Sequence, residues 1–341
     1  MNANLAYIFP GQGSQYVGMG KDLAQNYRAA AEIFERADHA LGFKLSELCF
    51  NGPVEDLQLT ENTQPAILTV SMAAYSALKE VMGAENFLKA DCLAGHSLGE
   101  YSALVAAGSL SFEDAVRVVR KRGRYMQEAV PVGVGAMAAI IGKGNIEAAV
   151  RKACRQAVEN HEGAICSPAN INAPHQVVIS GHTEAVERAM RLLQEDCPNV
   201  RRAMKLNVSA PFHCKMMQPV EELLAKDLRA VKFARLETPL LVTDVDNPVH
   251  VEDGETACKW LIKQVSSPVK WKNAVSHLVL RDHVGTFVEI GPGKVLTALV
   301  RHTASEALTL HVEDQASLEA TSLRLLEVMK SSERAGRMER L

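Results

Sequence analysis

Gly95-His96-Ser97-Leu98-Gly99 is the stretch that decides how this chain folds. It follows the apolar run Cys92-Leu93-Ala94 and leads into the Ala- and Leu-rich segment 100–107. A strand, a Gly-x-Ser-x-Gly turn and a helix in this order are typical of a nucleophile elbow, in which a sharp turn exposes a serine hydroxyl. Such a pentapeptide also occurs by chance, so the flanking segments carry the argument. We therefore predict that Ser97 is a nucleophile and that the N–H of Leu98 points toward a developing oxyanion.

A second glycine-bearing loop follows the first predicted strand. The strand is Leu5-Ala6-Tyr7-Ile8-Phe9, and the loop is Pro10-Gly11-Gln12-Gly13-Ser14-Gln15. Neither G-x-G-x-x-G nor P-loop spacing is present, which disfavours a phosphate site. Nucleophile-elbow hydrolases take a second oxyanion donor from an early strand-to-helix loop, and here the backbone N–H of Gln12 is the candidate. A plain tight turn remains the alternative for this loop.

Three helices are predicted around the elbow, at 24–41, 66–82 and 111–130. Gln64 immediately precedes the second helix, and its position favours a polar turn residue over a site residue. In the third helix Arg122 lies on one stripe with Ala115, Val119 and Met126. A guanidinium on an apolar stripe needs a carboxylate partner or must reach water. The partner is either a protein carboxylate or a carboxylate of the substrate, which the planar Arg fork binds in a bidentate manner.

From about Gly133 the pattern changes to short strands and helices. Strands are expected at 136–142, 164–172, 176–181 and 202–208, and helices at 145–158 and 183–197. This β-α-β-β-α-β order is that of a ferredoxin-like unit. The predicted architecture is α/β: a hydrolase-like domain with a parallel sheet, formed by residues 1–132 and 207–312, with a ferredoxin-like subdomain inserted at 133–206. A C-terminal helix and a charged tail, expected to be frayed from Glu333, occupy 313–341.

Two asparagines within this insert and one histidine after it are candidate active-site residues. Asn170 and Asn172 lie where a hairpin between the middle strands is expected, and they are turn residues on that basis. His213 follows a predicted strand and a Pro-bearing turn, where a loop side chain can face a cleft. A catalytic base and an ordinary loop histidine are equally compatible with this position. No Asp or Glu stands where a triad would need one, so either a third member is absent or a backbone carbonyl orients the imidazole.

Composition excludes several classes of protein. The net charge of −3 gives no overall field that favours nucleic acid. No apolar run approaches the length of a membrane span, and neither membrane insertion nor a signal peptide is expected. The seven cysteines are scattered without any C-x-x-C pair, which predicts reduced thiols, no metal site of that type, and a cytoplasmic location.

Eight segments carry a resemblance that extends over roughly residues 4 to 303. They are Phe9–Gln15, Thr63–Ala66, Gly95–Glu100, Arg122-Gly123 with Met126–Pro131, Asn170–Pro174, Ser209–His213, Gln264 with Pro268–Trp271, and Glu289–Lys294. In these segments the chain resembles the malonyl-CoA:acyl carrier protein transacylase family of bacterial fatty acid synthesis. The resemblance implies the same two-part architecture and a ping-pong acyl transfer without a bound cofactor. The malonyl group passes from malonyl-CoA to a serine ester and then to the phosphopantetheine thiol of acyl carrier protein.

The resemblance also implies roles for individual residues. Ser97 is the nucleophile, His213 the base oriented by a carbonyl near Gln264, and the N–H groups of Gln12 and Leu98 the oxyanion hole. Arg122 matches the malonate clamp, and the other expected substrate-binding residues are Gln64, Phe212, Asn172 and His96. Arg201 and Arg202, beside the strand that leads to His213, are expected to meet the acidic carrier protein.

Two other functions share this nucleophile. One is a trans-acting acyltransferase of a polyketide or other malonate-using system, which differs only in the carrier it loads. The other is a thioester hydrolase. Arg122 argues against a hydrolase of neutral acyl chains, because such a substrate would leave a buried cation without a partner.

Overall fold

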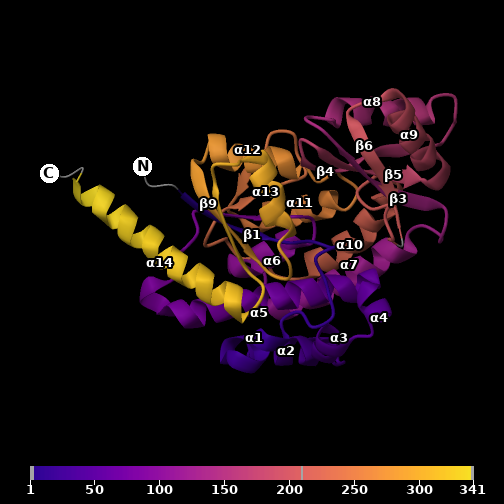
Figure 1. Cartoon of the computed structure of the whole chain (residues 1–341). Coiled ribbons are helices and arrows are strands. Elements are labelled where there is room, and N and C mark those ends of the chain that lie inside the picture. Colours follow the sequence, from indigo (N-terminus) through magenta and orange to yellow (C-terminus); the bar gives the residue numbers. More distant parts are fainter. Residues whose placement is uncertain (1–3, 209, 339–341) are drawn as a thin grey trace.

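The structure is a computed structural model that describes residues 4–208 and 210–338, with side chains described through Lys330. A six-stranded sheet forms the centre of the larger part (Figure 1), in the order β10-β9-β1-β2-β7-β8. All neighbouring strands are parallel except β7 and β8, which are antiparallel. The strands are β1 (Asn4–Phe9), β2 (Cys92–Gly95), β7 (Leu240–Leu241), β8 (His250–Val251), β9 (Val284–Ile290) and β10 (Leu308–Val312).

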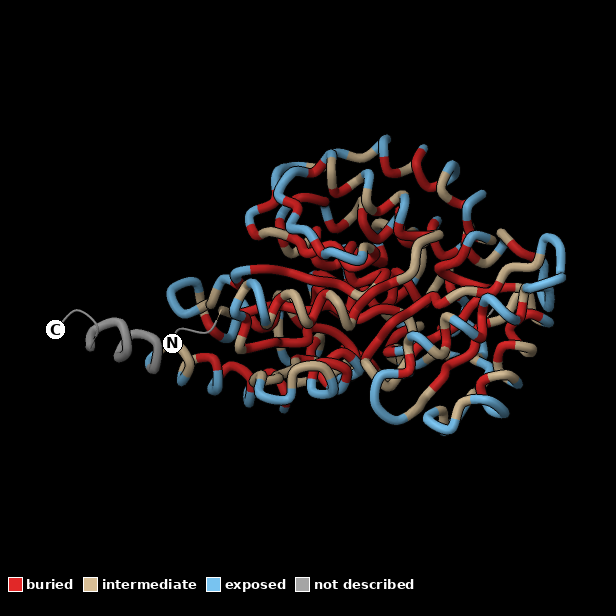
Figure 2. Tube along the Cα trace, turned by 90° about the horizontal axis from the view of Figure 1, so that it is seen from above, coloured by how far each residue is buried: buried red, intermediate tan, exposed pale blue. Residues whose placement is uncertain are grey.

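Helices cover both faces of this sheet, because its strands are apolar on both sides. Along β1, Leu5, Tyr7 and Phe9 join one core, whereas Ala6 and Ile8 join another on the opposite face. Continuous apolar strands of this kind are typical of parallel sheets with helices on both faces. Figure 2 shows the interior segments buried and most of the exposed residues on loops and outer helix surfaces.

The helices of the larger part fall into two groups. The first core packs against α1 (Lys21–Asn26), α2 (Arg28–Leu41), α3 (Leu45–Asn51), α4 (Val54–Gln58), α5 (Thr60–Asn86), α6 (Gly99–Ala106), α7 (Phe112–Glu128), α10 (Gln218–Ala230), α11 (Gly254–Gln264) and α14 (Gln315–Met338). The second core packs against α12 (Trp271–Leu280) and α13 (Val295–Thr303). A short 3-10 helix, Lys215–Met217, precedes α10.

A second, four-stranded sheet lies within the segment expected to be an insert. Its order is β4-β5-β3-β6, with every neighbouring pair antiparallel. The elements are β3 (Gly135–Gly142), α8 (Glu147–Val158), β4 (Cys166–Ala173), β5 (Gln176–His182), α9 (Thr183–Asp196) and β6 (Val200–Lys205). Ala138 and Ile140 of β3 pack under α8 and α9, while Met137 and Ala139 face the core of the larger part. Backbone hydrogen bonds between β4 and Val269 join the two parts.

The α/β class, the parallel sheet and the small antiparallel sheet are as predicted, but several local expectations were wrong. Gln64 is not a turn residue: α5 begins at Thr60 and includes Pro65, whose missing N–H removes one hydrogen bond near the helix start. Asn170 and Asn172 lie in β4 and not in the hairpin turn, because the strand continues to Ala173.

The C-terminal part also differs from the expectation. Helix α14 continues through Glu333 to Met338, because Glu, Arg, Ala and Met are good helix formers. Residues 339–341 of the predicted tail lie outside the described residues. Strand β10 and helix α12 were not predicted at all; β10 is an edge strand of mostly half-buried residues and shows no clear alternation. Among the described residues, no helix is both long enough and apolar enough to cross a membrane.

Candidate active site

Ser97 occupies the sharp turn between β2 and α6. Its φ of 54° lies in the left-handed region, which costs a non-glycine residue about 1–3 kcal/mol and is common at functional sites. The flanking glycines make this turn possible. A Cβ at Gly95 would lie 2.0 Å from the carbonyl carbon of Gly99, and one at Gly99 would lie 2.0 Å from the carbonyl oxygen of Phe9. The turn therefore has the geometry that the Gly-x-Ser-x-Gly pattern predicted.

His213 lies against the serine. Its Nε2 is 2.8 Å from Ser97 Oγ, and its Nδ1 is 3.1 Å from the carbonyl oxygen of Gln264 and 3.0 Å from that of Ser267. Two carbonyl acceptors at Nδ1 fix the tautomer that leaves Nε2 free to accept the serine proton. Burial, then the nearby Arg122 and His96, lower the pKa of His213 to about 3. The imidazole is accordingly neutral near pH 7, as a general base must be.

Arg122 is fully buried beside this pair. Its Nη1 donates to Gln64 Oε1 at 2.8 Å, and its Nη2 donates to Ser97 Oγ at 3.1 Å and to Gln264 Oε1 at 3.0 Å. The guanidinium also stands 5.5 Å from the centre of the Tyr101 ring. Within the described residues it forms no ion pair with a carboxylate, and its Nε has no acceptor. Burial lowers the pKa of Arg122. Because its Nε–H has no acceptor among the described residues, the side chain has donors available for an anion.

Gln264 connects these groups to a buried carboxylate that the sequence did not reveal. Its Nε2 donates to Glu100 Oε2 at 2.6 Å and to the carbonyl oxygen of Ser97 at 3.0 Å. This leaves its Oε1 facing Arg122, so the network itself sets the orientation of the amide. Glu100 also accepts from the N–H and hydroxyl of Thr243. Burial and the nearby Asp244 raise the pKa of Glu100. Gln264 is thus a positioning residue for Arg122, with Glu100 behind it.

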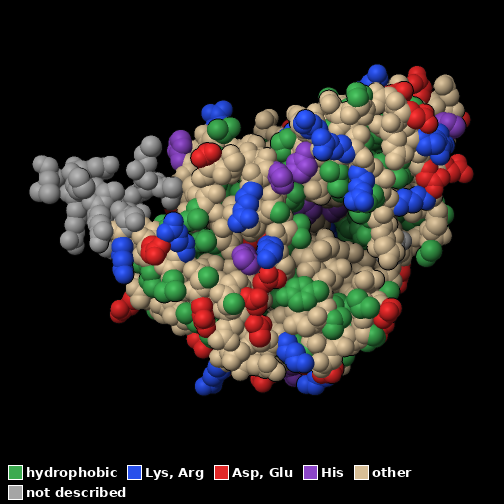
Figure 3. Space-filling model, viewed as in Figure 1, with side chains coloured by type: hydrophobic (Ala, Val, Ile, Leu, Met, Phe, Trp, Pro, Cys, Tyr) green, Lys and Arg blue, Asp and Glu red, His purple; other side chains and the backbone are tan. Residues whose placement is uncertain are grey.

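A cavity lies in front of Ser97, between the two parts of the molecule. Figure 3 shows the hollow at this junction, with histidine side chains at and within it. Gln12 and Leu98 line the cavity, and among the described residues their backbone N–H groups donate to no other group of the chain. The remaining lining residues are Gln64, His96, Ser97, Arg122, Met126, Met137, Asn170, Leu206, Val208, Phe212 and His213. The helical wheel placed Met126 near Arg122, but Met137, Leu206 and Val208 had no signal in the sequence.

Of the predicted site residues His96, Asn172, Arg201 and Arg202, only His96 lines the cavity. Its Nε2 lies 2.9 Å from Asn172 Oδ1. Asn172 therefore holds the His96 ring, while Asn170 of the same strand is the one that lines the cavity. Arg201 and Arg202 are exposed on the edge strand β6, and neither lines the cavity.

Known proteins share this architecture. A family model described as an acyl transferase domain matches residues 6–340. Malonyl CoA-acyl carrier protein transacylase of Bacillus subtilis (strain 168) is 44% identical over 93% of this chain and 96% of its own length. The chain belongs to the malonyl CoA-acyl carrier protein transacylase family. The transacylase of Escherichia coli (strain K12) is 43% identical over 94% of this chain and 99% of its own length.

Solved structures of transacylases from this family have the same fold. An acyl carrier protein S-malonyltransferase from Vibrio cholerae covers 94% of this chain and 100% of its own, at 42% identity and a TM-score of 0.86. A malonyl-transacylase solved in complex with a type II PKS acyl-carrier protein covers 94% of this chain and 99% of its own, at 40% identity and a TM-score of 0.86.

Proposed function

We propose that this transacylase transfers the malonyl group of malonyl-CoA to the phosphopantetheine thiol of an acyl carrier protein, through an ester on Ser97. The observation that carries the proposal is Arg122: a buried guanidinium 3.1 Å from Ser97 Oγ, with no carboxylate partner among the described residues. A malonyl thioester brings such a carboxylate, and its length places the carboxylate near the arginine when its carbonyl meets the serine. A bidentate, charge-assisted contact would bind it.

In the first half-reaction, Ser97 Oγ attacks the thioester carbonyl carbon and His213 Nε2 takes the serine proton. The N–H groups of Gln12 and Leu98 donate to the oxyanion of the tetrahedral intermediate. When this intermediate collapses, the carbon–sulfur bond breaks and His213 returns the proton to the departing CoA sulfur. The products are the malonyl ester of Ser97 and free CoA.

The second half-reaction reverses these roles. His213 accepts the proton of the phosphopantetheine thiol, and the resulting thiolate attacks the ester carbonyl. Collapse of the second intermediate releases Ser97 Oγ, which regains its proton from His213. Every proton and bond is accounted for by the two thiols, the serine and the imidazole, so the proposed reaction uses malonyl-CoA and the carrier as substrates and no bound cofactor.

The residues around Ser97 and His213 support selection of the malonyl group over other acyl groups. Phe212, adjacent to His213, is buried and lines the cavity, where its ring would stand beside the acyl Cα. Gln64 holds one side of the Arg122 fork and Gln264 the other. We also propose a cytoplasmic location, which agrees with seven cysteines that are all free thiols.

One assay distinguishes transfer of the malonyl group to a carrier from hydrolysis of the thioester. Purified enzyme is incubated with radiolabelled malonyl-CoA, with and without holo acyl carrier proteins of fatty acid and polyketide type. We expect the label to move to a carrier, with little free malonate formed in its absence, since the enzyme then stops at the serine ester. Release of malonate at the same rate with and without every carrier would identify a hydrolase and contradict the proposal. The carrier that is loaded faster identifies the pathway type.

A second prediction concerns the surface that meets the carrier. We propose that Arg201 and Arg202 attract the acidic carrier. On the face seen in Figure 3, other Lys and Arg side chains also lie over the subdomain around the hollow. Successive strand residues point to opposite faces. The alternation along β6 is interrupted at Arg201, because Val200 and Ala203, three residues apart, both pack toward the helices. Arg202 shares the face of Met204, which pairs with Ala139 on the side of the larger part.

Reversal of both charges with Arg201→Glu and Arg202→Glu is expected to lower kcat/KM for the carrier by roughly tenfold at low salt, an effect that added salt removes. Acylation of Ser97 by malonyl-CoA should change little. The matched control is Lys152→Glu with Arg155→Glu, an exposed pair on α8 of the same subdomain that changes the net charge equally. Equal carrier kinetics for the two double variants would show that Arg201 and Arg202 are ordinary solvated charges.

A further inference from the structure

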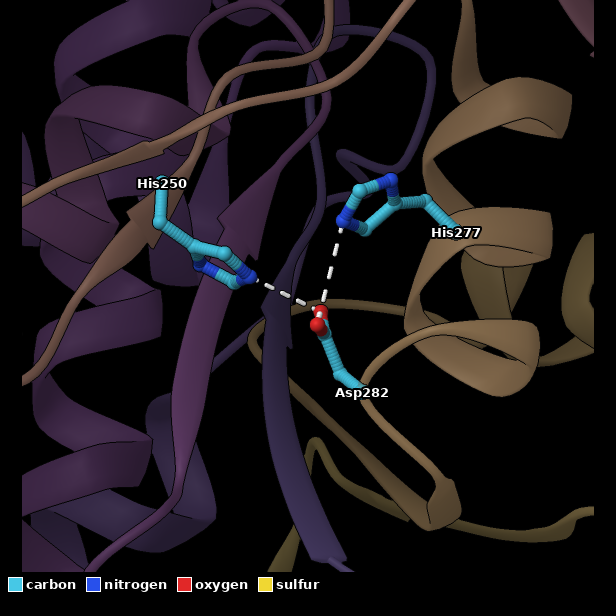
Figure 4. A group of neighbouring side chains, drawn as sticks. All are labelled: His250, His277 and Asp282. Carbon is cyan, nitrogen blue, oxygen red and sulfur yellow. Dashed lines mark hydrogen bonds and ion pairs between the residues drawn. The ribbon is translucent and has the colours of Figure 1, made fainter.

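Two histidines and one aspartate meet outside the active site, on the far edge of the large sheet. His250 lies in the edge strand β8, His277 in the last turn of α12, and Asp282 in the segment between α12 and β9. Figure 4 shows both imidazole rings directed toward the carboxylate from separate elements. None of the three lines the cavity in front of Ser97, and the proposed acyl transfer uses none of them.

The distances in this cluster are those of a potential metal site. His250 Nε2 lies 2.8 Å from Asp282 Oδ2, and His277 Nε2 lies 3.8 Å from Asp282 Oδ1. One ligand atom from each of the three residues lies within 4.8 Å of the others. Four ligands at about 2.0–2.1 Å from a tetrahedral Zn²⁺ are separated by about 3.3 Å. The observed separations bracket this value, so small side-chain rotations bring all three atoms to bonding distance.

The type and accessibility of the ligands indicate which ion would bind. Two imidazole nitrogens and one carboxylate suit Zn²⁺ and the neighbouring divalent transition metals, and they do not suit Mg²⁺ or Ca²⁺, which prefer oxygen ligands. The three side chains are between 23% and 32% exposed, so an ion can reach them from solvent. We propose that His250, His277 and Asp282 bind one Zn²⁺, with water at the fourth position.

The connections of the three ligands define what a bound ion would do. It would join the β7–β8 hairpin to the end of α12, two segments otherwise linked here by the contact of His250 with Asp282 and by the edge-to-face rings of His250 and His277. The Asp282 backbone is itself anchored, because its carbonyl accepts from Asn4 Nδ2 at 2.7 Å. Helix α11, which ends at Gln264, begins three residues after β8. The ion would therefore stabilise the edge of the sheet from which α11 departs, without contacting the reacting groups.

The test uses tag-free, full-length protein that has been treated with a chelator and dialysed. Zn²⁺ binding is measured by calorimetry and by elemental analysis after gel filtration, and Co²⁺ is used as a second probe because its visible absorption reports tetrahedral ligation. We expect one ion per chain. Zinc at about 100 times its dissociation constant should raise Tm by roughly 3–6 °C. Each of His277→Ala and Asp282→Asn should weaken Zn²⁺ binding at least tenfold and remove the Co²⁺ absorption.

The matched control is His302→Ala. His302 and His175 form another pair of facing imidazoles, with ring centroids 4.2 Å apart, but they do not belong to the cluster with a carboxylate. This variant should bind Zn²⁺ as the unmodified chain does. Circular dichroism of each variant without metal establishes that it is folded before binding is compared. If folded Asp282→Asn and His277→Ala bind Zn²⁺ as tightly as the unmodified chain, or if the unmodified chain binds none, the proposal is wrong.

Discussion

Arg122→Ala is expected to lower kcat/KM for malonyl-CoA by about 10⁴, and that for acetyl-CoA by only about tenfold. A substrate is strongly disfavoured when the protein side chain that pairs with one of its polar groups is removed, because that polar group is then buried without a partner. The malonyl carboxylate would be that group. Acetyl-CoA has no carboxylate, so it loses only the hydrogen bond from Arg122 to Ser97 Oγ. The preference for malonyl should therefore disappear or become inverted.

Two comparisons make this result specific. Arg124→Ala removes an exposed guanidinium from the same helix and should leave both substrates unaffected. Phe212→Ser enlarges the space beside the acyl Cα, and the exclusion of one methyl group by shape amounts to roughly 1–3 kcal/mol. This variant should accept more methylmalonyl-CoA and retain its preference for malonyl over acetyl. Equal losses with malonyl-CoA and acetyl-CoA in Arg122→Ala would make Arg122 a purely structural residue and would weaken the malonyl assignment itself.

Ser97→Ala is expected to abolish the covalent intermediate completely. After incubation with malonyl-CoA, intact-mass spectrometry should show a malonyl adduct on the unmodified chain and none on the variant. The substitution removes only a hydroxyl from a turn that the flanking glycines make possible, so the fold should remain intact, as circular dichroism can verify. Ser102→Ala, in the helix that follows the elbow, is the control: its hydroxyl is buried and has no partner among the described residues, so its adduct should form normally.

The companion variant His213→Ala should still form the adduct, but more slowly by roughly 10²–10⁴, which is the usual contribution of a general base. A full-occupancy malonyl adduct on folded Ser97→Ala would place the nucleophile elsewhere. An unchanged acylation rate in His213→Ala would remove His213 from the role of base while leaving Ser97 as nucleophile.

Local sequence was a reliable guide wherever near neighbours determine the backbone. The elbow at Ser97 requires glycine at two fixed positions and a strand and helix on either side, and all of these are visible in one short segment. The same holds for the helix expected at 111–130: Ser111 caps the start of α7, and its side chain accepts from the N–H of Asp114. Local pattern failed at Pro65 and Asn172, where a proline and an asparagine suggested turns inside what are a helix and a strand.

The sequence by itself determined the α/β class, the inserted antiparallel unit and the position of Ser97, because periodicity and glycine spacing act over a few residues. Tertiary structure decided what surrounds that serine. Arg122 meets Gln64, 58 residues away, and Gln264, 142 residues away, and the carbonyl oxygens of Gln264 and Ser267 take the position of a triad acid. The cluster of His250, His277 and Asp282 likewise exists only after β8 and α12 have packed. Such contacts depend on how whole elements pack against one another, and no single segment of the chain encodes them.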